Sequence, residues 1–281
     1  MCRLAFLASF LPATALLAAE VVSPTPIELP REPLRTEVVE ALDAAIEDAG
    51  AEVHIRLFKH RAMRHARAGD WKKAAADFRA VVAQAPGQVN VAQQAAAAML
   101  LGGERMTYEQ FVTDFLAAQA ENTNRTVLEK KAKLCVLPPD PIGDEETVKG
   151  WIAAAVEEGE NVQWSPYFTA TQALALYRYG DFEDALLAIR ETDRRHALTG
   201  GGNNDFLYTK TRLVEALCHA KAGDIEKAMA AFNKADHIIR PRMAELQTVL
   251  KGELWHDWMI AKILHDEACE VIKGVIAAAA E

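Results

Sequence analysis

The chain has 281 residues, of which 51% are hydrophobic and 25% are charged, a composition typical of globular proteins and unlike that of disordered ones. A formal net charge of −9 argues against a general nucleic-acid binder, because such proteins are usually basic. We therefore expect no nucleic acid among the partners. Alanine is abundant and runs of strand-favouring residues are scarce, which favours packed helices.

The N-terminal segment differs from the rest of the chain. Arg3 precedes an apolar run from Leu4 to Ala19 that ends in small residues. This run is shorter than the roughly 20 apolar residues that span a bilayer, so it predicts a signal peptide over residues 1–19. An uncleaved hydrophobic start is the alternative. We expect an exported protein, periplasmic or secreted, that does not span the membrane after signal cleavage.

A proline-rich segment follows at residues 20–33 and predicts an extended linker outside the fold. Residues 34–281 then form one helical domain. Its leading helix ends at Gly50, where the apolar spacing of three and four residues stops. Between residues 88 and 158 the pattern predicts four further helices, at 88–101, 107–120, 125–135 and 145–157.

One turn sequence occurs three times, at Ala68–Ala74, Tyr179–Ala185 and Ala222–Ala228. Each copy has a glycine, an aspartate, a bulky apolar residue, two spacers and an alanine. The glycine can adopt the left-handed conformation that ends one helix, and the aspartate can cap the next. The bulky residue and the alanine allow two helices to pack closely. The turns predict helix–turn–helix repeats.

The residues that follow each turn carry a family resemblance. Phe78 and Pro86 follow the first turn, Ile189 follows the second, and Phe232 and Pro241 follow the third. An alanine, an aromatic residue and a proline at these offsets resemble the tetratricopeptide repeat (TPR) family. The clearest repeats are 55–86, 166–192 and 209–241. Within the family, segments 175–185, 216–224 and 255–264 are similar to planctomycete-type TPR regions.

The resemblance implies an all-α, right-handed array of helical hairpins, a TPR-like solenoid. A long apolar stripe over residues 244–278 predicts a C-terminal helix that caps the array. Cys135, Cys218 and Cys269 form no C-x-x-C pair, and we expect each to be a buried free thiol.

The sequence indicates no catalytic, cofactor-binding or metal-binding residues. Gly200–Gly202 lacks the lysine of a phosphate-binding loop, and the motifs of serine hydrolases and zincins are absent. The best metal-ligand pairs are Glu253 with His256 and His265 with Cys269, and neither reaches three ligands. The segment Asp193–His196, which we expect in a polar loop, is the nearest second copy of the first pair. We expect Trp151, Trp164, Trp255 and Trp258 to make core or repeat–repeat contacts.

In TPR proteins the first helix of each repeat lines a concave surface on which peptides lie. The resemblance transfers this role to Arg56, Lys59, Met63 and Arg67 of the first repeat, Tyr167, Ala170, Leu174, Tyr177 and Arg178 of the second, and Lys210, Leu213, Leu217 and Lys221 of the third. The set contains basic residues and no acidic one, so the groove would attract an acidic partner. A solvated basic edge that pairs with acidic neighbours is the alternative.

These observations predict a non-enzymatic scaffold that binds a partner protein or peptide in its concave groove. The competing hypothesis from another class is a helical metalloenzyme or hydrolase.

Overall fold

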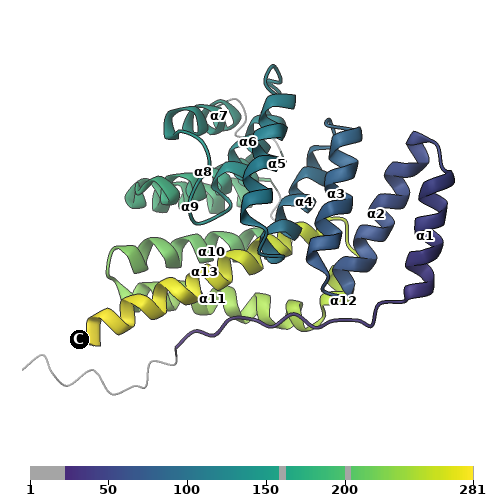
Figure 1. The fold of residues 1–281 in the computed structure, drawn as a ribbon. Helices are drawn as coiled ribbons and strands as arrows, with labels where there is room; N and C mark the ends of the chain where they lie inside the picture. The colour runs from purple at the N-terminus through teal and green to yellow at the C-terminus, as the bar shows by residue number, and fades with distance from the viewer. Residues whose placement is uncertain (1–22, 158–162, 200–203, 281) are drawn as a thin grey trace, which may run out of the picture.

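The computed structural model describes residues 23–157, 163–199 and 204–280, and all of its regular elements within these ranges are helices (Figure 1). In chain order they are α1 (Thr36–Asp48), α2 (Ala51–Arg67), α3 (Trp71–Gln84), α4 (Val89–Leu101), α5 (Arg105–Ala118), α6 (Arg125–Val136), α7 (Glu145–Glu157), α8 (Ser165–Tyr179), α9 (Phe182–Leu198), α10 (Asp205–Lys221), α11 (Ile225–Ala244), α12 (Leu246–Val249) and α13 (Trp255–Ala280). The predicted signal peptide lies outside the described residues. None of the described helices is long and apolar enough to cross a membrane.

The three repeated turns adopt the conformation that their sequence predicts. Gly69, Gly180 and Gly223 have φ of 75°, 91° and 78°, in the left-handed region. The side chains of Asp70 and Asp224 accept hydrogen bonds from the backbone N–H groups three residues later, at 3.3 and 3.1 Å.

Asp181 is the exception among the turn aspartates. It makes no side-chain cap for α9 and instead forms an ion pair with Lys149 of α7. The alanine of each turn, Ala74, Ala185 and Ala228, is fully buried, as close packing of the paired helices requires. The turn therefore forms at all three places, and at two of them the aspartate caps the N-terminus of the helix that follows.

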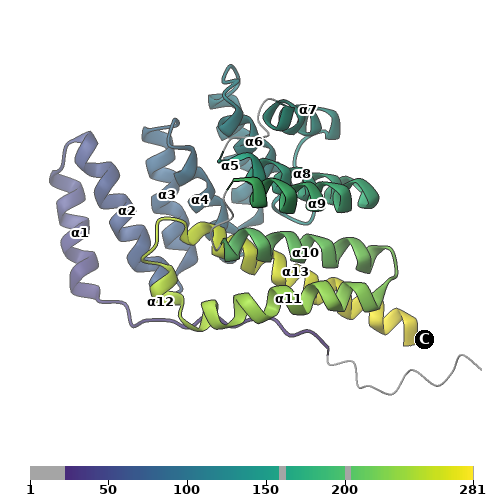
Figure 2. The same cartoon turned by 180° about the vertical axis from the view of Figure 1, so that it is seen from behind.

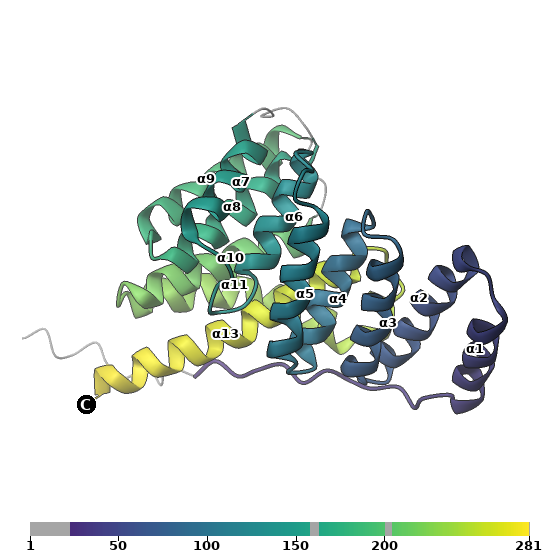
Figure 3. The same cartoon turned by 45° about the horizontal axis from the view of Figure 1, so that its top comes forward.

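Helices that follow one another in the chain pack as neighbours. The most extensive contacts join α2 to α3, α8 to α9 and α10 to α11, the three helix pairs that the repeated turns connect. Helix α3 also packs on α4, and Figure 3 shows α1 to α5 side by side in chain order. Phe78, Ile189 and Phe232 are buried between the helices, so the aromatic or aliphatic residue after each turn belongs to the core.

The C-terminal helix begins later than predicted. Helix α11 continues through Pro241 to Ala244, and α12 with its following turn separates it from α13, which starts at Trp255 rather than at residue 244. Proline removes only one hydrogen bond near the helix end, and the fully buried Met243 holds the last turn in place. Pro241 therefore does not stop the helix.

Helix α13 packs against α10, α11 and also α4, which lies far from them in the sequence. In Figure 1 it crosses the molecule diagonally from α4 to the turn that joins α10 to α11. Its apolar face, including Met259, Leu264 and Ile272, is buried. Helix α13 therefore covers α4 in addition to the last helix pair, α10 and α11.

The proline-rich segment is extended, as predicted, but from residue 23 onward it packs on the domain. Ile27 is buried, the backbone N–H of Glu32 donates to the carbonyl of Arg67 at 2.9 Å, and Arg240 donates to the carbonyl of Thr25 at 3.1 Å. Figure 2 shows this segment running along α11 to the start of α1. The expectation of an unattached linker is corrected, because its apolar side chains find a buried site.

Candidate functional site

Helix α13 covers the part of the predicted groove that α8 and α10 form. Leu213 and Leu217 of α10 are fully buried, and Tyr177 of α8 is also buried. The Lys210 ammonium lies 2.5 Å from the Asp257 carboxylate of α13, and the Arg178 guanidinium pairs with Glu267 of α13. Both basic residues thus pair with acidic residues of the same chain. The alternative of a basic edge that pairs with acidic neighbours anticipates such pairing, but these two pairs are buried and not solvated.

Five other predicted groove residues, three of them on α8, have varied surroundings. Leu174 is buried and Ala170 is partly buried. Arg67 and Tyr167 are partly buried. The Arg67 carbonyl accepts a hydrogen bond from Gln247 at 3.2 Å, and the Tyr167 hydroxyl accepts one from Asn204 at 2.5 Å. Lys221 is exposed and lines a cavity of about 710 Å³ between the end of α8 and the middle of α13, together with Tyr177 and Arg178. The acidic side chains of that cavity include Glu267 and Glu270, which already pair with Arg178 and Lys273.

The remaining predicted residues lie on α2, where the groove is open. Lys59 and Met63 line a cavity of about 560 Å³ that is also bounded by the start of α4 and by residues 250–256. Arg56, Lys59, His60 and Met63 line an adjoining hollow of about 290 Å³. We call the larger cavity the open groove.

The floor of the open groove is aromatic and its rim is polar. Trp255 and Phe78 stack with ring centroids 5.6 Å apart, and both are buried. Lys59 and Lys251 lie at the rim, and neither has an ion-pair partner within the described ranges. Glu253 is the acidic residue among those lining the cavity. The open groove thus combines an apolar floor with an excess of basic side chains.

His256 is the buried polar residue at this cavity. Its side chain is only 4% exposed, and its Nδ1 atom has no hydrogen-bond partner. Burial lowers the pKa of His256 to about 4, so the ring is neutral at physiological pH. A buried polar atom without a partner is uncommon in folded proteins, which marks this position for attention.

A cluster of buried charges holds the start of α13 in place behind His256. Glu129 of α6 accepts hydrogen bonds from Lys133 and from Thr171 of α8, each at 2.6 Å, and lies 3.1 Å from the Lys130 ammonium. Burial opposes ionisation of Glu129, but Lys130 and Lys133 outweigh it and lower the pKa of this carboxyl to about 2. Lys210 and Lys133 similarly hold the pKa of Asp257 well below its usual range against burial.

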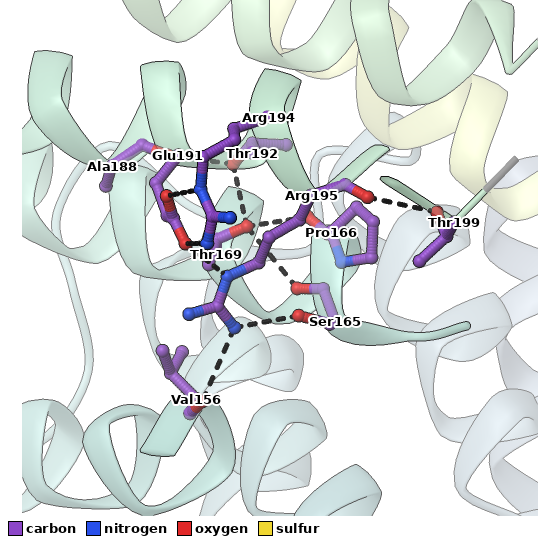
Figure 4. A network of polar contacts seen from close by, with 10 residues as sticks. All are labelled: Val156, Ser165, Pro166, Thr169, Ala188, Glu191, Thr192, Arg194, Arg195 and Thr199. Carbon is purple, nitrogen blue, oxygen red and sulfur yellow. Dashed lines mark hydrogen bonds and ion pairs between the residues drawn. The ribbon is translucent and has the colours of Figure 1, made fainter. Parts of the chain in front are cut away.

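A second polar network connects α7, α8 and α9 (Figure 4). The Arg195 guanidinium donates to the Ser165 hydroxyl at 2.7 Å and to the Glu191 carboxylate at 2.6 Å, and the Thr192 hydroxyl donates to that of Thr169 at 2.9 Å. Ser165 is fully buried against Arg195, and no histidine or carboxylate of the described residues forms a hydrogen bond with its hydroxyl. The geometry is that of a structural network rather than of an activated nucleophile.

Of the metal-ligand candidates that the sequence suggests, His265 contacts Cys269 as well as a carboxylate of α11. His265 Nε2 lies 2.8 Å from the Asp236 carboxylate, and its Nδ1 lies 3.7 Å from Cys269 Sγ. The segment Asp193–His196 lies in helix α9 and not in the expected loop, and Asp193 pairs with Arg212 of α10 at 2.6 Å. Among the described residues no cluster of three or more His, Cys, Asp or Glu side chains has a metal-binding arrangement. Cys135, Cys218 and Cys269 are buried free thiols, as predicted.

The tryptophans divide between core and surface. Trp255 is buried, whereas Trp164 is 51% exposed. Trp164 begins a row of aromatic rings that continues through Tyr167 and Phe206 to Trp258, with neighbouring centroids 5.6, 6.0 and 6.1 Å apart. This row joins the residue before α8 to α8, α10 and α13, so Trp164 and Trp258 lie in a contact between neighbouring helices.

No family model matches this chain, and a search of curated proteins finds none that is similar to it. The open groove therefore has to be interpreted from its own geometry. Sequence reasoning identified Lys59 and Met63 but missed Lys251 and the start of α4, because neither belongs to the first helix of a recognisable repeat.

Proposed function

We propose that this protein is a non-enzymatic interaction scaffold, a right-handed TPR-like array that binds a partner protein or peptide in the open groove. The proposal depends above all on one observation. Lys59 and Lys251 stand without ion-pair partners, within the described residues, above an apolar floor formed by Phe78 and Trp255. An apolar cavity with a few convergent polar groups is typical of binding sites.

The open groove is a better candidate than the larger cavity beside α8. There the Arg178 guanidinium is only 1% exposed and is already neutralised by Glu267. Asp266 likewise pairs with Lys262. A ligand at that cavity would compete with ion pairs within the molecule, whereas a ligand in the open groove would supply the missing partners.

Site-specific photo-cross-linking in the native host can test the scaffold proposal. A photoreactive amino acid at Leu254, which lines the open groove and is 46% exposed, should capture a partner that elutes as a discrete species. The same amino acid at Leu187, which is 54% exposed on α9, is the matched control. Identical products from the two positions, or none from position 254, would contradict a groove-binding scaffold.

The proposal includes export from the cytoplasm, which depends on the apolar run of residues 4–19. Mass spectrometry of the protein isolated from its host should find an N-terminus near Ala19 or Glu20. An intact Met1 on cytoplasmic protein would contradict this part of the proposal.

A further inference from the structure

A small cavity lies among α6, α8, α10 and α13, beside the buried charges that hold the start of α13. Its volume is about 20 Å³, which is room for one water molecule or one ion of similar size. Lys133 of α6 and Lys210 of α10 line it, together with apolar side chains that include Leu174, Val214 and Leu264. None of the described residues that line this cavity is acidic.

Both lysines retain hydrogen-bond donors that a group in the cavity can use. Their side chains are only 8% and 9% exposed. Lys133 donates to the Glu129 carboxylate at 2.6 Å, and Lys210 donates to the Asp257 carboxylate at 2.5 Å. An ammonium group has three N–H donors, so each lysine keeps donors beyond its bond to a carboxylate. Neither carboxylate lines the cavity, so an acceptor there would meet the lysines without meeting an acid.

The buried charges beside the cavity do not balance. When protonated, Lys130, Lys133 and Lys210 carry three positive charges, against two negative charges on Glu129 and Asp257. The imidazole that borders Asp257 is neutral. Burial lowers the pKa of Lys130 and of Lys210, because a buried ammonium with too little opposing charge is unfavourable. One monovalent anion would remove the excess positive charge.

We propose that this cavity is a binding site for a small monovalent anion, chloride, between the ammonium groups of Lys133 and Lys210. The volume of the cavity excludes larger oxyanions such as sulfate. Because the two lysines belong to α6 and α10, and Lys210 also pairs with Asp257 of α13, the ion stabilises the packing of α13 on the other helices. The site is separate from the open groove, so its failure would leave the proposed scaffold function unchanged.

Thermal denaturation of the full chain tests whether chloride binds the folded protein. Sodium chloride is exchanged for sodium gluconate at constant ionic strength, since gluconate is too large for the cavity. The melting temperature should rise with chloride concentration, because a ligand that binds the folded state alone stabilises it. A melting temperature that does not respond to this exchange would overturn the proposal, since the cavity would then hold water.

Variants of the chain locate the ion. Lys133→Met removes one donor group, and Ala170→Val narrows the cavity while every charge stays in place. Each should weaken chloride binding by about tenfold, measured as the excess broadening of the chloride NMR line by the protein. Lys130→Met balances the charges without changing the lining and should also weaken binding. Lys234→Gln, at an exposed position on α11, is the matched control and should leave the broadening unchanged.

Broadening that survives in both Lys133→Met and Ala170→Val would mean that chloride binds elsewhere on the protein, and the proposal would be wrong. Ala170→Val keeps the test decisive even if Lys133→Met does not fold, because it removes no buried charge. Loss of the chloride response in these variants, with the response retained in Lys234→Gln, would support the site between the two lysines.

Discussion

At the scale of single residues, two histidines of α13 show how strongly position determines charge. His256 lies among buried groups that include Lys130, Lys133 and Lys210, and burial keeps it neutral, with a pKa of about 4. His265 is also buried, but its Nε2 lies 2.8 Å from the Asp236 carboxylate. Hydrogen bonds to Asp236 and Asp266 outweigh burial and raise the pKa of His265 to about 10. The helix thus carries one neutral and one protonated imidazole.

The pKa of His265 makes folding stability depend on pH. Its folded value, about 10, lies above the ordinary value of 6.5. The stabilisation is therefore fully present below pH 6.5 and is lost as the pH rises toward 10. We expect His265→Gln to lower the free energy of unfolding by about 3 kcal/mol at pH 6 and by much less at pH 10. Urea denaturation of both proteins at the two pH values measures this difference, and equal losses at both would show that the ring is not protonated in the fold.

The repeated turns show which residue properties the sequence predicts well. The left-handed glycines and the buried alanines follow from local geometry, so Gly69, Gly180 and Gly223 were predictable from the pattern alone. The missing cap at Asp181 was not predictable, because it results from Lys149 on α7, a partner that is distant in the sequence. Local conformation could be inferred from local sequence, and side-chain pairing between helices could not.

At the scale of helices, the sequence likewise does not predict which helices α13 contacts. Its apolar stripe predicts that one face is buried, but a stripe contains no information about which helices will cover it. The ion pairs that set its position join it to α8 and α10, through Glu267 with Arg178 and Asp257 with Lys210. Arg178 and Lys210 were predicted as groove residues, and only the structure shows that they anchor α13.

We predict that Asp257 and Lys210 contribute to the free energy of unfolding as a coupled pair and not independently. Both side chains are 9% exposed, so Asp257→Asn leaves the Lys210 ammonium buried near Lys133 with less opposing charge. We expect this variant to lose about 3 to 5 kcal/mol of stability, because breaking a buried pair leaves an uncompensated charge. Replacing both residues, as Lys210→Met with Asp257→Leu, should cost much less. Chemical denaturation of the two singles and the double measures the coupling, and additive losses would contradict it.

At the scale of the whole molecule, the chain is net acidic, but its charges are not evenly placed. The predicted groove gathers basic residues, and the structure divides them into two groups. Arg178 and Lys210 are buried under α13, whereas Arg56 is exposed and Lys59 and Lys251 line the open groove. The sequence could suggest these basic residues as one group, since the resemblance to TPR proteins assigns them to a common groove. It could not predict that the C-terminal helix covers Arg178 and Lys210, because this depends on the three-dimensional path of the chain.

This division predicts opposite outcomes for the same substitution at two lysines. Lys59→Glu should weaken the binding of an acidic peptide without lowering the melting temperature, because a partly exposed charge without an ion-pair partner among the described residues contributes little to stability. Lys210→Glu should lower the melting temperature markedly, because it places a second carboxylate beside the buried Asp257. The loss of binding in Lys59→Glu should also make the remaining affinity less sensitive to salt, since the attraction that is screened over about 10 Å at 0.1 M has been reduced.

Thermal denaturation and peptide titration at two salt concentrations separate these effects, with Lys234→Glu on the exposed side of α11 as the control for net charge. If Lys210→Glu melts like the unmodified protein and loses peptide binding, then α13 does not remain seated on α10 in solution, and the ligand would occupy the whole basic face. If Lys59→Glu alone loses binding, the partner occupies the open groove, and α13 remains seated over Arg178 and Lys210.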